Sequence, residues 1–241
     1  MIKAIIFDCD GVLVDTERDG HRVAFNRAFA ALGIDAEWDV PTYGELLLIA
    51  GGKERMRSYF DRHGWPAGRS ETHDDLILAL HKKKTAIFME TIASGQLPLR
   101  PGIARIVDEA IAAGVRLGVC TTSDPKSIDG VLDLFGPERK ARFEFVHAGD
   151  IVSRKKPDPE IYELAKRSLQ LPVNACIVIE DSRNGLLAAT GAGLPCLITT
   201  STYTTGEEFG EAAAVVPELG DPPNVRITLA DLARLASKAA A

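Results

Sequence analysis

The chain has few cysteines, few aromatic residues and no excess of positive charge, and these shortages exclude several classes of protein. Its 241 residues include four cysteines without a CxxC pair or zinc-binding spacing, so neither a disulfide framework nor a zinc site is indicated. The net charge of -6 and the lack of a basic stripe with interleaved aromatics argue against nucleic acid or a membrane as partner. No apolar run approaches transmembrane length and no signal-peptide pattern is present, so we expect a cytoplasmic monomer with reduced core thiols.

The most informative pattern lies at the start of the chain, where the apolar residues 4–7 are followed by Asp8, Asp10 and Gly11. A short apolar run that stops at an acid and a turn-forming Asp-Gly pair predicts a strand buried on both faces of a parallel sheet. In open sheets of this kind, ligands bind beyond the carboxyl ends of the strands. The Asp-Gly pair taken alone fits a simple turn better than a catalytic site, so the ends of the other strands decide between the two interpretations.

Three further strand-like runs end in side chains that complement these acids. Residues 115–120 are followed by the hydroxyls of Thr121, Thr122 and Ser123, ahead of a helix that begins at a proline. Residues 143–146 lead to Lys156, which the following proline holds in an extended conformation. Residues 176–179 end in Glu180 and Asp181 at the start of a helix. Each group also has a local interpretation, as a helix cap or a solvated loop charge.

Taken together, the four strand ends favour a functional site with a metal ion. If they converge, Asp8, Asp10, Glu180 and Asp181 place four negative charges in one crevice, and a like-charge pair about 4 Å apart costs roughly 4 kcal/mol at an effective dielectric near 20. Lys156 supplies one positive charge, and a divalent cation would supply two. Oxygen ligands without histidine or cysteine favour Mg²⁺ over Zn²⁺, so we predict Mg²⁺ as the cofactor.

A magnesium ion, a lysine and hydroxyls around one nucleophilic carboxylate are typical of a phosphoryl-transfer site. We predict Asp8 as the nucleophile that forms an aspartyl-phosphate, and Asp10 as the acid and base that protonates the leaving alkoxide and then deprotonates water. The phosphoryl oxygens would be held by Thr121, Thr122 and Lys156. The predicted metal ligands are the Asp8 carboxylate, the Asp10 carbonyl and Asp181, with Glu180 on the ion or just behind its ligands.

The chain resembles the haloacid dehalogenase (HAD) superfamily, whose four motifs are matched in order by Asp8-Cys9-Asp10-Gly11, Thr121, Lys156-Pro157 and Glu180-Asp181-Ser182. This resemblance spans the whole sequence. It implies an α/β fold, with a Rossmann-like parallel sheet as the catalytic core and an inserted α-helical cap domain. The acid at Asp10 is typical of the phosphatases and phosphomutases of the superfamily, since the dehalogenases lack it. The resemblance therefore implies an enzyme that handles phosphate.

The cap would occupy residues 16–96, and the core residues 1–15 and 97–241. This insertion is too long for a loop and carries helical patterns. Helical spacing runs from Glu17 to Leu32 and stops at Gly33, and further helices are predicted over residues 53–63, 74–93 and, in the core, 229–240. In the superfamily, a cap at this position recognises the substrate and excludes water during the chemistry.

The candidate substrate contacts in the cap each allow two interpretations. His21 lies on an apolar helical stripe, which is typical of a core histidine, although it is close in sequence to the acidic motif. Residues 51–55 open a helix with two glycines and two cations, which fits either anion capture or a solvated helix start. Lys84 ends a charged run that is ordinarily a solvated face, and helical rotation turns only one or two of its residues inward. The candidate contacts are Glu17, His21, Gly51, Gly52, Lys53, Arg55 and Lys84.

These cap residues, with Tyr43-Gly44-Glu45-Leu46, are similar to those of the CbbY-type phosphatases, which remove phosphate from xylulose 1,5-bisphosphate, a misfire product that inhibits Rubisco. A bisphosphate substrate would place one phosphate at Mg²⁺ and the other on the cap cations. The β-phosphoglucomutases share much of this cap plan, and Val12 after Gly11 suits many of them, so a phosphosugar mutase stays open. A non-catalytic phospho-receiver is disfavoured, because such a domain needs neither Asp10 nor a long lid.

Overall fold

The computed structural model describes residues 2–95 and 97–238, and the chain divides into two compact units. Met1–Asp15 and Pro98–Ala241 form one of them, here called the core unit, and Thr16–Leu97 form the other, the helical unit. Leu97 belongs to the helical unit, one residue beyond the boundary predicted from the sequence. The reason is its packing against Gly20, where an added Cβ would lie 2.9 Å from Leu97 Cδ1.

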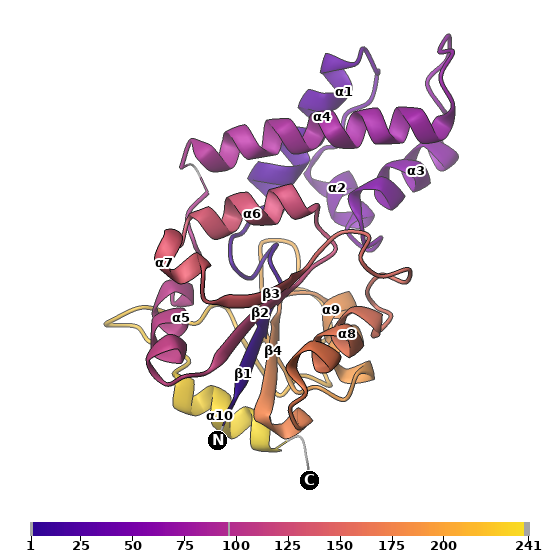
Figure 1. The fold of residues 1–241 in the computed structure, drawn as a ribbon. Helices are drawn as coiled ribbons and strands as arrows, with labels where there is room; N and C mark the ends of the chain where they lie inside the picture. The colour runs from indigo at the N-terminus through magenta and orange to yellow at the C-terminus, as the bar shows by residue number, and fades with distance from the viewer. Residues whose placement is uncertain (1, 96, 239–241) are drawn as a thin grey trace. The chain divides into compact units, whose positions relative to one another are not determined.

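The core unit is built on a six-stranded parallel sheet in the order β3-β2-β1-β4-β5-β6 (Figure 1). Its strands are β1 Ala4–Phe7, β2 Arg116–Cys120, β3 Phe143–His147, β4 Cys176–Glu180, β5 Cys196–Thr199 and β6 Ala214–Val216. In the middle of the sheet, Phe7 of β1 pairs with Val119 of β2 and Ile179 of β4. The segments that follow these three strands therefore start at the same edge, and the predicted fold class is confirmed.

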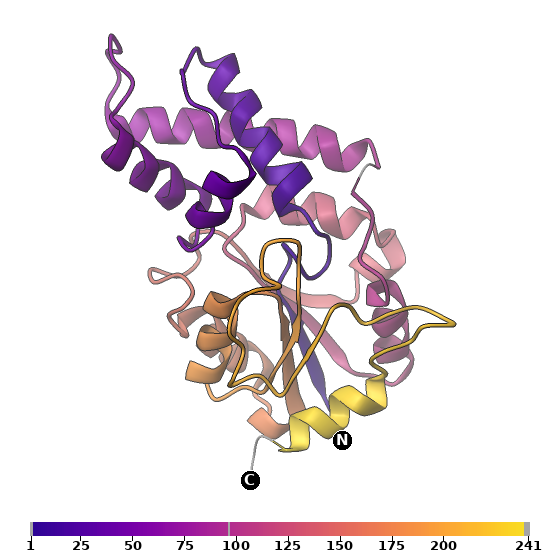
Figure 2. The same cartoon turned by 180° about the vertical axis from the view of Figure 1, so that it is seen from behind.

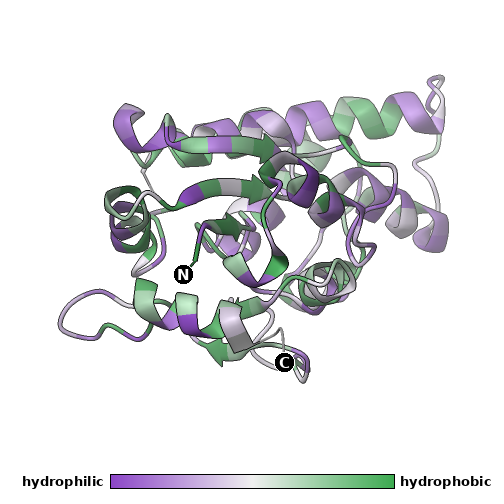
Figure 3. Cartoon of the chain, turned by 60° about the horizontal axis from the view of Figure 1, so that its bottom comes forward, coloured by the Kyte–Doolittle hydropathy of each residue, from purple (hydrophilic) through white to green (hydrophobic). Residues whose placement is uncertain are grey.

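Helices cover both faces of this sheet. α5 (Ile103–Ala112) and α10 (Leu229–Lys238) pack on one face, and α8 (Glu160–Leu169) and α9 (Arg183–Gly191) pack on the other (Figures 1 and 2). Between β2 and β3 lie α6 (Pro125–Asp133) and α7 (Pro137–Lys140), and a 3-10 turn, Val173–Ala175, precedes β4. Most strand residues are hydrophobic (Figure 3), as expected of a sheet covered on both sides. Residues 239–240, predicted to end the last helix, lie outside the described residues.

Alternation along the strands decides which side chains reach the α8 and α9 face. Ala4 and Ile6 of β1 and Cys176 and Val178 of β4 belong to one buried cluster with residues of these two helices. Because successive side chains of a strand point to opposite faces, the acids two residues further on, at positions 8 and 180, point to that same face. The strand register thus brings two carboxylates together before any loop is considered.

The helical unit is built around buried aromatic rings. It contains a π-helical turn η1 (Glu17–His21) and helices α1 Arg22–Ala31, α2 Val40–Leu46, α3 Gly52–His63 and α4 His73–Ala93. Phe25, Phe29 and Trp38 are in mutual ring contact and almost fully buried. The helices predicted near residues 17–32, 53–63 and 74–93 are confirmed, and α2 is an additional one. Within the described part of the chain, no helix is both long and apolar enough to cross a membrane.

Candidate active site

One buried lysine joins the acids at the carboxyl edge of the sheet. Asp8 directly follows β1, and its backbone N–H donates to the Ile179 carbonyl at 2.9 Å. Lys156 Nζ donates to Asp8 Oδ1 at 2.8 Å, to Glu180 Oε1 at 2.6 Å and to the Cys120 carbonyl at 2.9 Å. The side chains of Asp8, Lys156 and Glu180 are all buried, and Glu180 has no exposed surface. Groups from β1, β2 and β4 therefore meet on one ammonium group.

Asp181 completes a carboxylate cluster that fits a divalent cation. One carboxylate oxygen from each of Asp8, Glu180 and Asp181 lies within 4.8 Å of the others, and all three residues are buried. Gly11 makes the close approach possible, because it adopts φ +79° and a Cβ there would lie only 2.0 Å from Asp181 Oδ2. Gly185 likewise leaves room for Glu180, whose Cδ would lie 2.0 Å from an added Cβ. A cluster of oxygen donors alone fits Mg²⁺ rather than a softer metal.

The charges of the cluster are not balanced by its lysine. Burial, and after it the carboxylates of Glu180 and Asp10, raise the pKa of Asp8 to about 7, against the opposing effect of Lys156. Burial by itself lowers the pKa of Lys156, but Asp8 and Glu180 raise it above its ordinary value, so the ammonium stays charged. Burial, and then Glu180, raise the pKa of Tyr162, whose hydroxyl donates to Glu180 Oε1. A bound dication would neutralise the excess negative charge.

Asp10 lies beside the hydroxyl cluster that follows β2. Ser123 Oγ donates to Asp10 Oδ2. Thr121 Oγ1 accepts from the Ser123 N–H at 3.2 Å, and the Thr121 N–H donates to a β3 carbonyl at 2.9 Å. The helix that follows is capped by Asp124, whose side chain accepts from the Lys126 N–H. Thr121 and its neighbour Thr122 are therefore not used as the cap of α6, which was their local interpretation.

In the helical unit, Glu17 and Arg55 belong to one buried polar network with Tyr43. The Tyr43 hydroxyl donates to Glu17 Oε2 and accepts from Arg55 Nη1 at 2.8 Å. Arg55 Nε also donates to the Leu46 carbonyl at 3.1 Å, and Nη1 lies 3.9 Å from Glu17 Oε2. A solvated helix start does not describe Arg55, since its side chain is buried. The other residues of this segment lie where α3 begins, with Gly51 as its N-cap, Gly52 as its first residue and Lys53 in its first turn.

Lys84 and His21 form a second buried pair in the helical unit. Lys84 Nζ lies 2.9 Å from His21 Nδ1, and it also lies 4.9 Å from the ring centre of Phe25 and 5.2 Å from that of Phe88. His21 is 3% exposed and Lys84 is 6% exposed, whereas the preceding lysines are exposed. Helical rotation has therefore turned one lysine of the run inward, as predicted for one or two of them.

The model of the haloacid dehalogenase-like hydrolases matches residues 2–193, a segment that contains all four motifs of the core unit. The chain belongs to the haloacid dehalogenase-like hydrolases.

This HAD-like hydrolase is similar to CbbY proteins along most of its length. It is 49% identical over 232 residues to a CBBY-like protein of Arabidopsis thaliana, which covers 95% of this chain and 72% of the relative. It is 45% identical over 215 residues to protein CbbY of Cereibacter sphaeroides, with 88% and 90% of the two chains covered. The crystal structure of CbbY from Rhodobacter sphaeroides in complex with phosphate has a TM-score of 0.86 and 42% identity, and covers 96% of this chain and 99% of that one. A mutant of that protein in complex with xylulose-(1,5)bisphosphate matches to the same extent. These comparisons identify the chain as a phosphatase.

Three residues of the core unit of this HAD-like hydrolase make contacts in the site that were not predicted. Ser123 was predicted as the third hydroxyl of the cluster after β2, but not as a donor to Asp10. Tyr162 follows an apolar pattern on α8 that is typical of a core aromatic, so its bond to Glu180 leaves no signal in the sequence. Arg100 contacts the Gly11 carbonyl from a segment almost 90 positions away, and no local pattern marks it.

Proposed function

We propose that this HAD-like hydrolase is a Mg²⁺-dependent phosphatase of a sugar bisphosphate, with xylulose 1,5-bisphosphate as its substrate. The observation that carries the proposal is the buried convergence of Asp8, Lys156, Glu180 and Asp181 at the end of three adjacent strands. The substrate is supported by the likeness to CbbY from Rhodobacter sphaeroides, whose mutant binds xylulose-(1,5)bisphosphate in its crystal structure. By the same resemblance, the reaction would remove an inhibitor of Rubisco.

In the first proposed step, a carboxylate oxygen of Asp8 attacks the phosphorus and the bond from phosphorus to the sugar oxygen breaks. Asp10 gives its proton to the leaving sugar alkoxide. Lys156 holds Asp8 in place through its 2.8 Å bond and offers its charge to the phosphoryl oxygens, together with the Thr121 hydroxyl and the Thr122 amide. When bound to Asp8, Asp181 and the Asp10 carbonyl, Mg²⁺ would supply further positive charge against those oxygens.

In the second proposed step, Asp10 accepts a proton from water as the water attacks phosphorus, and the bond from phosphorus to Asp8 breaks. Inorganic phosphate leaves and both carboxyl groups return to their starting states. Ser123, which donates to Asp10 Oδ2, keeps that carboxyl on one side of the nucleophile in both steps. Glu180 does not contact the phosphoryl group in this proposal. Its Oε1 accepts hydrogen bonds from both Lys156 and Tyr162 and so holds the Lys156 ammonium group against Asp8.

For the helical unit we propose a role as the cap that recognises the substrate. The proposed contacts are Glu17, His21, Gly51, Gly52, Lys53, Arg55 and Lys84. Support comes from two cations, on Arg55 and Lys84, that are kept buried at the cost of desolvation in a unit of this size. Arg55 pairs with Glu17, and Lys84 lies beside His21. We propose that a second phosphate of the substrate binds to donors of the same two cations.

We further propose that the enzyme acts as a cytoplasmic monomer. The four cysteines are free and buried, which is typical of proteins in a reducing compartment. Sedimentation of the purified protein tests the oligomeric state, since a monomer would sediment near 26 kDa.

The proposed function is tested by phosphate release from xylulose 1,5-bisphosphate in the presence of Mg²⁺. We expect release that stops when the metal is chelated and that Asp8→Asn abolishes. We expect Asp10→Asn to lower turnover by orders of magnitude and to leave metal binding largely intact, because the proposed ligand at that position is the backbone carbonyl. Phosphate release by Asp8→Asn at the rate of the unmodified enzyme would contradict the assignment of the nucleophile.

A phosphosugar mutase is the alternative, because Val12 after Gly11 and the cap pattern also suit the β-phosphoglucomutases. Incubation with glucose 1-phosphate and a trace of glucose 1,6-bisphosphate separates the two functions. A phosphatase would release phosphate without forming glucose 6-phosphate. Efficient formation of glucose 6-phosphate would replace the proposal by the mutase.

A further inference from the structure

Arg100 lies in the segment by which the chain returns to the core unit, and its side chain donates hydrogen bonds to four backbone carbonyls. Nη1 donates to the carbonyls of Gly11 and, at 3.3 Å, Thr199, and Nη2 donates to those of Thr200 and Pro217, both at 2.7 Å. One guanidinium thus joins the acidic motif after β1 to the segment after β5. That segment runs in long loops towards α10 (Figure 2).

The Gly11 carbonyl is a sensitive point for such a contact. Gly11 has φ +79°, and its Cα lies so close to Asp181 that an added Cβ would be 2.0 Å from Oδ2. The residue before it, Asp10, carries the carbonyl proposed as a metal ligand. A displacement of the Gly11 backbone would therefore change the gap between its Cα and Asp181 and would also move the adjacent Asp10 carbonyl.

The backbone of Arg100 also fixes the same loop, because its N–H donates to the Leu13 carbonyl at 2.8 Å. Two residues on, Asp15 Oδ2 accepts from the hydroxyl of Thr202 at 2.6 Å. The loop of residues 11–15, which directly follows the acidic motif, is thereby tied at both of its ends to residues 199–202. The side chain of Arg100 supplies the contact nearest to the carboxylate cluster.

The charge of Arg100 and its hydrogen bonds have opposite effects on the affinity of the site for a divalent cation. Burial lowers the pKa of Arg100, and Asp15 and then Asp181 raise it, and a guanidinium stays protonated at any pH at which the protein is folded. A positive charge close to Asp181 repels a second cation, whereas a fixed Gly11 favours the cation by holding its ligands in place. A lysine at this position would keep the charge and lose the planar fork that reaches several carbonyls at once.

We propose that Arg100 is a positioning residue for the metal site, which raises the affinity for the divalent cation by fixing the Gly11 peptide against Asp181. The inference rests on the metal site of the proposed function and names a residue of this chain on which its affinity depends. When residues that hydrogen-bond to metal ligands and orient them are replaced, the affinity for the metal typically falls by roughly 10- to 100-fold. Arg100 acts through backbone carbonyls, so we place its effect at about tenfold.

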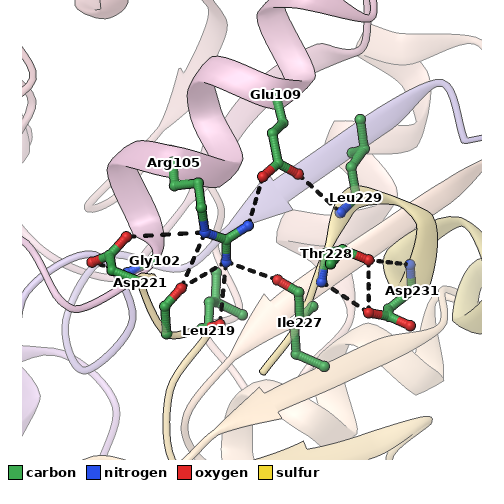
Figure 4. A network of polar contacts seen from close by, with 10 residues as sticks. Gly102, Arg105, Glu109, Leu219, Asp221, Ile227, Thr228, Leu229 and Asp231 are labelled. Carbon is green, nitrogen blue, oxygen red and sulfur yellow. Dashed lines mark hydrogen bonds and ion pairs between the residues drawn. The ribbon is translucent and has the colours of Figure 1, made fainter. Parts of the chain in front are cut away.

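Arg105 provides a matched control, since its guanidinium also binds backbone carbonyls (Figure 4). Its hydrogen bonds within the described part of the chain do not include residues 8–11. Its guanidinium donates to the carbonyls of Leu219, Gly220 and Ile227 at 2.8–3.2 Å. It also pairs with Glu109 at 2.7 Å. Replacing Arg105 by lysine therefore loosens the segment before α10 in the same way, without a direct effect on Gly11.

The experiment measures binding of Mn²⁺ alone to the full chain by electron paramagnetic resonance of the free ion, with Mg²⁺ as competitor. We expect R100K to raise the Kd for the metal about tenfold, and R105K to leave it within twofold of the unmodified protein. Activity gives a second readout: R100K should need more Mg²⁺ for half-maximal rate and recover nearly the full kcat at saturating Mg²⁺. Loss of folded protein alone would lower kcat at every Mg²⁺ concentration and leave the Kd unchanged.

The outcomes separate this inference from the proposed function. An unchanged or tighter Kd in R100K overturns the positioning role, and so does an equal loss in R105K. Absence of Mn²⁺ binding by the unmodified protein overturns the metal site itself and, with it, the proposed function. If R100K is unfolded at the working temperature, metal binding is measured on R100Q below its own melting temperature. A Kd for R100Q within twofold of that of the unmodified protein would then overturn the positioning role of Arg100.

Discussion

Replacing Lys156 by methionine should destabilise the metal-free protein strongly, because the ammonium group is the shared partner of two buried carboxylates. Asp8 and Glu180 lie 2.8 and 2.6 Å from Nζ, and both side chains are buried. Removing one partner of a buried ion pair typically costs about 3–5 kcal/mol. In a chain of this length each kcal/mol lowers the melting temperature by about 2–4 °C, so we expect a fall of roughly 6–20 °C at pH 8.

The pH dependence of this loss gives the prediction a second arm. Without the ammonium group, nothing from Lys156 opposes the rise in the pKa of Asp8, so this buried carboxylate loses its charge by binding a proton as the pH falls. The difference in unfolding free energy between Lys156→Met and the unmodified protein should therefore shrink between pH 8 and pH 5. The matched control is the double variant Lys156→Met/Glu180→Gln, which removes one of the two charges and should regain part of the loss.

The assay is urea unfolding followed by circular dichroism, in the presence of a chelator. A loss below about 1 kcal/mol at pH 8, the size typical of an exposed ion pair, would refute the buried cluster as the structure shows it. A loss that is the same at pH 5 and pH 8 would refute the electrostatic reasoning even if the destabilisation were large.

Three further predictions concern single contacts of the site. Gly11→Ala should abolish Mn²⁺ binding, because the added Cβ would lie 2.0 Å from Asp181 Oδ2. The control Gly136→Ala, at a glycine with a similar φ of +78° and open space around it, should leave Mn²⁺ binding intact. Equal binding by both variants would contradict the close approach of Gly11 to Asp181. The metal-free protein should lose stability as pH rises from about 4 to 7, by up to about 1.4 kcal/mol per pH unit, because the folded state raises the pKa of Asp8 from 3.8 to about 7 and so keeps a proton that the unfolded state loses. Urea unfolding of Asp8→Asn should lack this slope, and an unchanged slope would contradict Asp8 as its source. Tyr162→Phe should cost about 1–3 kcal/mol, because it takes a donor from the buried Glu180; a change below 0.5 kcal/mol in thermal unfolding, within the range of an ordinary surface substitution, would argue against that bond.

The sheet and its acids could be predicted because both follow from simple periodicities. An apolar run that stops at a charged residue marks the end of a buried strand, and parallel strands end at the same edge. Alternation then explains why Asp8 and Glu180 share a face, since they follow Ile6 and Val178 by two residues. The local pattern was sufficient here because the chemistry lies directly on the ends of regular strands.

The remaining contacts depend on rotation and on distant loops. Lys82, Lys83 and Lys84 are identical in type, and only the helix phase buries the third, which lies four residues from the buried Leu80 and Phe88. That spacing was available in the sequence and favours Lys84. Arg100, by contrast, gains its partners from segments about 90 and 100 positions away, and no periodicity of its own segment shows where its guanidinium ends.

Anomalous diffraction from crystals soaked in Mn²⁺ would show whether Asp8 and Asp181 bind one divalent cation at the end of the sheet. We expect one strong peak within coordination distance of a carboxylate oxygen from each of these residues. A peak that contacts neither carboxylate, or no peak in crystals that hold Mn²⁺ at millimolar concentration, would contradict that expectation.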